Sequence, residues 1–264
     1  MSDKPRILAV ETSSRRGSVA LGLGSALLAQ EVFSADQRHA GELLPTIDRL
    51  CRRQGWAPAD IEQVYVSAGP GSFTGLRIAI TAAKTLAFAG GVKIVAVPSL
   101  EAAVVSALAA EKKLGLTIER VAVVLDAKRQ QIYTAAFERI GKSKDEDIPL
   151  LPEGASREGT FKEEFIPGFR TIYPAAVVAP AEMLARVARP LYLLGEGIRY
   201  HAEALTADDV ISLPEEYWLP EAASVLACGW RRAQAGQFTP ADTLVPFYLR
   251  RPEAEEKWEQ LHPE

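Results

Sequence analysis

The sequence predicts an α/β fold in which two domains each contain a mixed β-sheet flanked by helices. Short apolar runs with the character of strands alternate with helical patterns along most of the 264 residues, which is typical of α/β proteins. The chain opens with an apolar strand that ends in Glu11 and continues into a hairpin. The same pattern returns where residues 121–125 end in Asp126, which indicates an internal duplication.

The composition is that of an ordinary soluble protein, with 48% hydrophobic residues, a net charge of −4 and a pI of about 5.6. This charge argues against strong, unaided binding to nucleic acid. The two cysteines, Cys51 and Cys228, make no disulfide framework, so we expect a reducing cytosol. We see no signal peptide and no apolar run that could span a bilayer. His39, His201 and His262 lack the spacing of metal ligands.

The central stretch of the chain is a glycine loop, residues 67–75, between a predicted strand at 64–66 and a predicted helix that ends at Ala89. Strand, loop and helix in this order can direct backbone N–H groups and the positive helix end at an anion. The glycines match neither a Walker loop nor the dinucleotide-binding pattern. A tight turn without a ligand therefore stays open as the alternative.

Two carboxylates complete the candidate phosphate or nucleotide site. Glu11 and Asp126 each follow an apolar strand, where a carboxylate could meet a bound phosphate–metal complex or could simply cap the turn. The candidate contacts are Glu11, Thr12, Ser13, Gly69, Gly71, Ser72, Thr74, Gly75 and Asp126.

Two predicted helices, 36–54 and 74–89, carry more apolar surface than one sheet can cover. The first has one apolar stripe, interrupted only by Pro45, and the second is apolar on nearly all sides. Such faces meet either the core of the chain or a partner, and we expect a partner. The predicted interface residues are Leu43, Leu44, Ile47, Leu50, Leu76, Ile80, Ala83 and Ala87.

The remaining chain continues the alternation of strands and helices. A charged, poorly periodic segment at 141–174 reads as a surface insertion. Gly195-Glu196-Gly197 repeats the strand–glycine–helix turn of the first half. We predict strands at 18–23, 26–33, 92–97, 131–137, 191–194 and 210–213, and helices at 99–113, 180–188 and 221–235. The predicted domains are 1–103, 104–220 and a C-terminal helix and tail at 221–264, part of which can join the first domain.

Four segments in order resemble one known family over nearly the whole chain. They are residues 7–13, 69–77, 125–128 and 247–250. Together they are similar to the TsaB (YeaZ) family, bacterial accessory proteins in the synthesis of threonylcarbamoyladenosine on tRNA. Glu11 stands where that family usually has Asp.

This resemblance implies the two-domain fold of acetate kinase, Hsp70 and actin, and a cytoplasmic, non-catalytic scaffold subunit. It implies pairing with a catalytic sibling of the same fold, TsaD, and with a small ATPase, TsaE, to modify adenosine 37 of tRNA. We expect a homodimer when the chain is alone, because the same apolar patch would be bare. We expect contact with tRNA only through the complex and no cofactor of its own, with ATP or ADP at the complex interface.

Two enzymatic alternatives of the same fold stay open, a small-molecule kinase and a metallopeptidase. A kinase needs phosphate cradles, a metal-binding acid and a base, and we find no persuasive base. The catalytic sibling carries His-x-x-x-His on the helix after its glycine block, and the matching positions here are Ser99 and Ala103. Neither is a good ligand for zinc or iron. We therefore predict no catalytic residue and no metal site.

Overall fold

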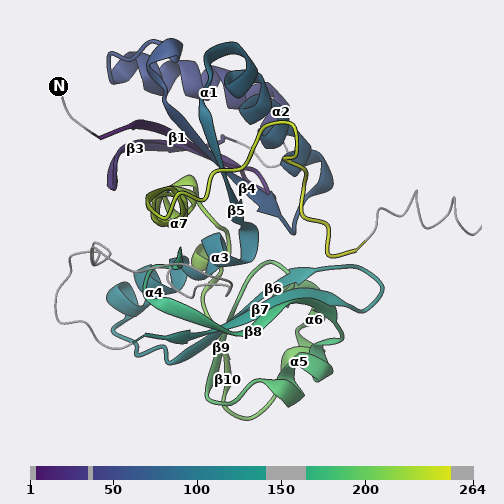
Figure 1. Cartoon of the computed structure of the whole chain (residues 1–264). Helices are drawn as coiled ribbons and strands as arrows, with labels where there is room; N and C mark the ends of the chain where they lie inside the picture. Colours follow the sequence, from purple (N-terminus) through teal and green to yellow (C-terminus); the bar gives the residue numbers. More distant parts are fainter. Residues whose placement is uncertain (1–3, 35–37, 141–164, 251–264) are drawn as a thin grey trace, which may run out of the picture.

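The computed structural model describes residues 4–34, 38–140 and 165–250, and it contains two five-stranded mixed sheets, one above the other in Figure 1. The strand orders are β3-β2-β1-β4-β5 and β10-β9-β6-β7-β8. The predicted α/β fold with two mixed, helix-flanked sheets is confirmed.

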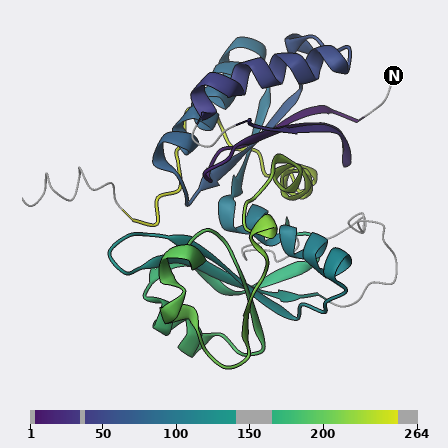
Figure 2. The same cartoon turned by 180° about the vertical axis from the view of Figure 1, so that it is seen from behind.

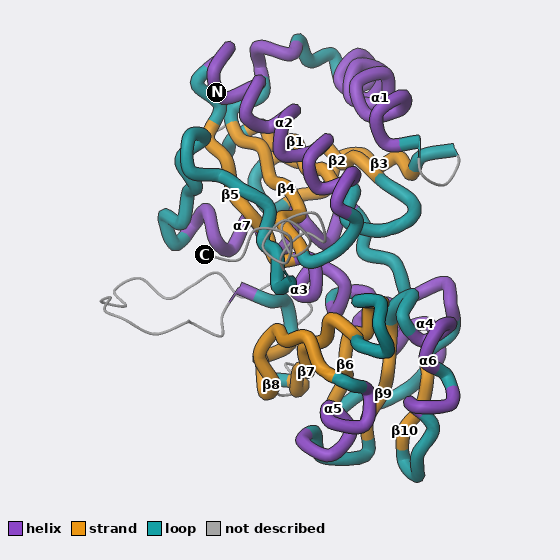
Figure 3. The backbone as a smooth tube through the Cα atoms, turned by 90° about the vertical axis from the view of Figure 1, so that its right-hand side faces the viewer, coloured by secondary structure: helices purple, strands orange, loops and turns teal. Residues whose placement is uncertain are grey.

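The first sheet is built from β1 (Arg6–Glu11), β2 (Ser18–Leu23), β3 (Ala26–Val32), β4 (Gln63–Gly69) and β5 (Lys93–Pro98). β1, β2 and β3 pair antiparallel, whereas β4 and β5 run parallel to β1. Alternate strand residues face opposite sides of the sheet. Leu8 and Val10 therefore pack beneath α1 (His39–Arg53) and α2 (Phe73–Gly90), while Ile7 and Ala9 pack on α7 (Ala222–Gln234). Figure 3 shows α1 and α2 together on one side of this sheet.

The second sheet repeats the opening of the first. β6 (Arg120–Asp126) pairs antiparallel with β7 (Ile132–Arg139) and parallel with β9 (Leu191–Leu194), as β1 does with β2 and β4. β8 (Phe169–Val178) and β10 (Val210–Ser212) form its edges. Its helices are α4 (Ser106–Leu114), α5 (Pro180–Arg186) and α6 (Ile198–His201).

The chain crosses between the sheets through α3 (Ser99–Val104), which follows β5 directly and contacts strands of both sheets as well as α7. The prediction of one helix over 99–113 is wrong in that two helices form, with Val105 between them. Helix α7 then returns to the first sheet, and Figures 1 and 2 show it between the two layers.

The prediction of a surface insertion over 141–174 is wrong at its C-terminal end, because β8 of the second sheet begins at Phe169. Pro174 lies inside this strand, where it removes one ladder donor, and such a residue is tolerated because β8 is a sheet edge. Residues 141–164 lie outside the described residues.

The C-terminal segment crosses from the first half of the chain to the second. The Phe247 N–H donates to the Ala68 carbonyl at 2.6 Å, and Arg250 Nη1 donates to the Ala127 carbonyl at 2.8 Å. In Figure 1 this segment is the yellow loop that passes beside α2. Among the described residues, no helix combines the length and apolar character that a membrane span requires.

Candidate functional site

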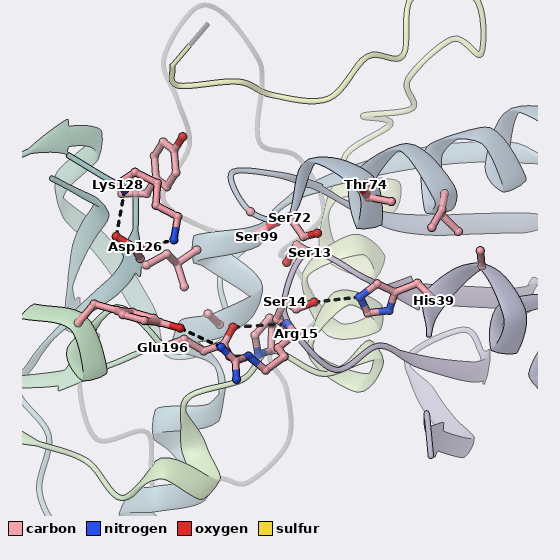
Figure 4. Close-up of a pocket in the computed structure, with 18 residues that line it drawn as sticks. Ser13, Ser14, Arg15, His39, Ser72, Thr74, Ser99, Asp126, Lys128 and Glu196 are labelled. Carbon is pink, nitrogen blue, oxygen red and sulfur yellow. Dashed lines mark hydrogen bonds and ion pairs between the residues drawn. The ribbon is translucent and has the colours of Figure 1, made fainter. Parts of the chain in front are cut away.

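A cleft of about 550 Å³ separates the two halves at the ends of β1, β4 and β6 (Figure 4). The first half contributes the loop after β1 and the glycine loop, and the second half contributes the β6–β7 turn and the loop before α6. Several predicted site residues line it, namely Ser13, Gly71, Ser72, Thr74 and Asp126, and they are joined there by Ser14, Arg15, Ser99, Lys128, Tyr133, Glu196 and Tyr200.

The glycine loop packs directly against the loop after β1. The Ser72 N–H donates to the Ser13 carbonyl at 2.7 Å, and Thr12 Oγ1 donates to the Gly75 carbonyl at 2.8 Å. A Cβ atom at Gly75 would lie 1.9 Å from the Thr12 carbonyl oxygen, so only glycine allows this approach. A Cβ atom at Gly71 would likewise lie 2.3 Å from the Ser13 carbonyl oxygen. The glycines therefore serve chain packing.

Three backbone N–H groups of the loop that a phosphate cradle could offer are already hydrogen-bonded within the protein. The Gly75 N–H donates to Ser72 Oγ at 3.2 Å, which makes Ser72 the N-cap of α2. The Gly69 N–H donates to Ser99 Oγ at 3.0 Å. The Ser72 N–H is held by Ser13, as described above. This arrangement matches the tight turn that we left open as the alternative to a phosphate loop.

Glu11 is fully buried and does not line the cleft. Its Oε1 accepts hydrogen bonds from the Ser13 N–H at 2.5 Å and from Ser13 Oγ at 2.6 Å. Burial raises the pKa of Glu11 to about 7, against the opposing effect of hydrogen bonds from Ser13 and Ser67. Its Oε2 has no hydrogen-bond partner among the described residues. This carboxyl group thus caps its own turn and is not positioned to reach a ligand in the cleft.

Asp126 lies at the cleft and holds the β6–β7 turn. Its Oδ1 accepts from the Lys128 N–H at 3.0 Å and lies 3.2 Å from His201 Nε2, and its Oδ2 pairs with Lys128 Nζ at 2.7 Å. Burial tends to raise the pKa of Asp126, but the hydrogen bonds from Lys128 and His201 outweigh it and leave this pKa below its ordinary value. The carboxylate is therefore charged and already partnered.

An ion pair that the sequence did not reveal joins the halves across the cleft. Arg15 Nε lies 3.3 Å from Glu196 Oε1, and Arg15 Nη2 donates to Tyr200 Oη at 2.8 Å. Figure 4 shows Arg15 and Glu196 side by side between the two halves. The glycine-flanked position of Glu196 was the available signal, because the Gly195-Glu196-Gly197 turn repeats the glycine loop of the first half.

A second, apolar groove of about 700 Å³ lies between α1 and α2. Leu43, Leu44 and Ile47 line it from α1, and Phe73 and Ile78 line it from α2. Leu44 is 66% exposed, although it is a large apolar residue. The groove is an uncovered hydrophobic surface of the kind that usually meets another protein.

Six predicted interface residues are buried inside this chain, each at most 8% exposed: Leu43, Ile47, Leu50, Leu76, Ile80 and Ala83. Leu43 and Ile47 still line the groove, but the assignment of the other four to a partner surface is wrong. Leu76, Ile80 and Ala83 lie on α2, which packs against β4 and β5, and Leu50 lies on α1 in the same hydrophobic core. Their burial leaves no area there for a second protein. Ala87 is half-buried and does not line the groove. The surface that remains is the groove itself.

Ser99 and Ala103 line the cleft, as expected for residues that stand on one helical face. Ser99 holds the glycine loop, and Glu101 points to the other side, where its Oε2 accepts from Arg232 at 2.6 Å. No group of three His, Cys, Asp or Glu side chains that could hold a metal occurs within residues 4–34, 38–140 and 165–250.

Comparison with known proteins finds relatives over nearly the whole chain that carry the names TsaB and YeaZ. The chain is 28% identical to the tRNA threonylcarbamoyladenosine biosynthesis protein TsaB of Bacillus subtilis, over 96% of this chain and 97% of that protein. It is 25% identical to TsaB of Escherichia coli, over 93% of this chain and 94% of that protein. The structure is similar to YeaZ from Pseudomonas aeruginosa, with a TM-score of 0.69 and 27% identity, over 93% of this chain and 100% of that one.

A more distant similarity connects the N-terminal half to a transferase. The family model for TsaD, tRNA N6-adenosine threonylcarbamoyltransferase, matches residues 28–151. The transferase of Anaeromyxobacter dehalogenans is 30% identical, over 40% of this chain and 36% of that protein. The whole-length matches carry the TsaB and YeaZ names, and the resemblance to the TsaB (YeaZ) family that the sequence motifs indicated is therefore confirmed.

Proposed function

We propose that this chain is a non-catalytic accessory subunit in the synthesis of threonylcarbamoyladenosine on adenosine 37 of tRNA. The observation that carries the proposal is its match over almost the full length to proteins named for this biosynthesis. The transferase of Anaeromyxobacter dehalogenans matches only 40% of this chain, and the TsaD family model matches residues 28–151. This difference supports a role beside the transferase.

The α1–α2 groove is the surface through which we expect the chain to pair with a TsaD-like catalytic sibling. It is apolar and exposed, and it lies on the half of the chain that the TsaD family model matches. Siblings of one fold can present similar helix pairs to each other. The same groove supports a homodimer when the chain is alone.

The remaining parts of the proposal concern the wider complex. We expect a TsaE-like ATPase as a second partner, a cytoplasmic location, and contact with tRNA only within the complex. The chain needs no cofactor of its own, and ATP or ADP belongs at the interface with the partners. The internal use of the glycine-loop N–H groups supports this assignment, because those groups are engaged with Ser13, Ser72 and Ser99.

Reconstitution tests the proposal. The purified chain is washed with chelator, analysed for metals, and assayed for threonylcarbamoyl transfer to tRNA alone, with the TsaD-like sibling, and with the sibling plus the ATPase. We expect no stoichiometric metal in the chain, no transfer by the chain alone, and a large gain in transfer when the chain joins the sibling. Transfer without the sibling, or no effect of the chain on the sibling, would contradict the accessory role.

A further inference from the structure

An exposed tyrosine at the mouth of the cleft is flanked by two cations. Tyr200 is 53% exposed, and its Oη accepts a hydrogen bond from Arg15 Nη2 at 2.8 Å. Lys128 Nζ lies 5.4 Å from the centroid of the Tyr200 ring. Arg15 comes from the first half of the chain and the other two residues come from the second. We call these three residues the Tyr200 surface.

The two ion pairs of the Tyr200 surface place their cations toward solvent. The Lys128 side chain is 79% exposed, whereas that of its partner Asp126 is 14% exposed. The Arg15 side chain is 37% exposed, against 22% for Glu196. In both ion pairs the cation is therefore the more exposed member, although the chain carries a net charge of −4.

The turn that presents Lys128 has an unusual backbone. Lys128, Arg129 and Gln130 have φ angles of 61°, 51° and 60°, and three consecutive left-handed residues other than glycine are uncommon. The turn is fixed from below, because Asp126 Oδ1 accepts from the Lys128 N–H and the Ala127 carbonyl accepts from Arg250. Strained conformations that the surroundings enforce often mark functional sites.

An exposed aromatic ring with one cation over the ring and another at its hydroxyl group matches the chemistry that binds unpaired RNA. A base without a pairing partner stacks on an aromatic side chain, and the neighbouring phosphates pair with Lys and Arg. Tyr200 itself lines the cleft of about 550 Å³, together with Ser13, Ser14 and Ser72.

We propose that the Tyr200 surface binds a single-stranded segment of the tRNA substrate within the complex. This inference rests on the proposed function and adds to it a direct RNA contact on the accessory subunit. A free nucleotide shares the same chemistry of base and phosphate. RNA is favoured because the cations lie outside on the rim, while the glycine-loop donors at 69, 72 and 75 inside are engaged.

Binding of a labelled anticodon stem-loop of the substrate tRNA tests this proposal. Fluorescence anisotropy is recorded over a series of salt concentrations for the full chain paired with its sibling and for the full chain alone. The variants are Tyr200→Ala, Tyr200→Phe and Lys128→Gln, and the matched control is Lys112→Gln, an exposed lysine on α4 outside the cleft. A fully paired RNA duplex with the same number of nucleotides and ATP serve as competitors.

We expect Tyr200→Ala to weaken stem-loop binding about ten-fold and Tyr200→Phe to retain it, because the ring stacks without its hydroxyl. Lys128→Gln should reduce the slope of log affinity against log salt by about 0.7, the value for one phosphate contact on a single strand. The control should behave as wild type.

Three results would overturn the proposal: unchanged affinity and slope in Tyr200→Ala and Lys128→Gln, equal losses in Lys112→Gln, or variants that lose ATP binding but retain the stem-loop. Sizing of the same samples reports pairing with the sibling. Normal pairing and modification with unchanged RNA binding would therefore refute this inference alone, whereas absent pairing of the wild type would refute the proposed function.

Discussion

The two halves of the chain open alike, yet their carboxylates have opposite surroundings. Glu11 at the end of β1 is fully buried, and burial raises its pKa to about 7. Asp126 at the end of β6 reaches the cleft, and hydrogen bonds from Lys128 and His201 overcome the effect of burial and lower its pKa. The same topology therefore places a buried contact between the loop after β1 and the glycine loop in one half, and a charged surface turn in the other.

This difference means that the polar loop groups of the first half serve packing, whereas those of the second half remain available for binding. The first half uses its loop polar groups internally and leaves an apolar groove between α1 and α2. The second half keeps Lys128 and its neighbours at the surface. A repeated topology thus does not imply a repeated site, and each half has to be assigned from its own contacts.

The largest effect is expected from Gly75→Ala, which disrupts the contact between the glycine loop and the loop after β1 in the first half. The added Cβ would lie 1.9 Å from the Thr12 carbonyl oxygen, so α2 has to move or the β1 loop has to open. We expect a loss of about 3 kcal/mol in the free energy of unfolding. Denaturant unfolding measures it. Gly41→Ala, with nothing within 4 Å of its Cβ, is the control and should not destabilise. Equal destabilisation by Gly75→Ala and Gly41→Ala would contradict the close packing of Gly75 against Thr12.

A smaller, pH-dependent effect should follow from Glu11→Gln. The folded pKa of about 7 exceeds the ordinary 4.5, so the folded state retains the proton between these values and the unfolded state does not. The wild type should therefore lose stability as pH rises from about 4.5 to 7, by at most about 3 kcal/mol. Glu11→Gln cannot ionise and should be more stable than wild type at pH 8, with little difference at pH 4.5. Parallel stability curves for both proteins would contradict the burial of this charge.

The smallest effect is expected for Asp126→Asn, and here the pH dependence of the free energy of unfolding has the opposite sign to that for Glu11. The pKa of Asp126 is lowered in the folded state, so its contribution is present above the ordinary value of 3.8 and disappears as pH falls through the lower folded pKa. We expect the variant to lose about 1 kcal/mol at pH 7 and to approach wild type in strong acid. Chemical denaturation at pH 7 and pH 3 checks this. A deficit that grows in acid would show that the two carboxylates do not differ as described.

The sequence was sufficient for features that depend on local residues. The strand–glycine loop–helix unit was predicted because Ser72 and the glycines carry the signal of a helix start, and Leu191–Leu194 was predicted as a buried apolar strand. The alternation of strands and helices predicted the α/β fold with mixed sheets, and the family resemblance implied its two-domain form. β8 was missed because its sequence contains Pro174 and lacks clear alternation.

Contacts between distant parts of the chain could not be predicted. The approach of Gly75 to Thr12 and the pairing of Arg15 with Glu196 join residues far apart in sequence. Leu76 and Leu44 are both apolar and helical, yet only the packed structure shows that Leu76 is core and Leu44 is exposed. A helix that is apolar all round indicates burial but does not identify the covering surface.

The most direct test of the account is the dissociation constant between this chain and its TsaD-like sibling for Leu44→Asp. Leu44 lines the groove and is 66% exposed, so the variant should fold normally. Burying one leucine contributes about 1.5–3 kcal/mol, so the charge should weaken pairing by about 100-fold. Leu27→Asp, 49% exposed on β3 outside the groove, is the matched control and should pair as wild type. Wild-type pairing by folded Leu44→Asp would contradict the central claim that this chain acts through the α1–α2 groove.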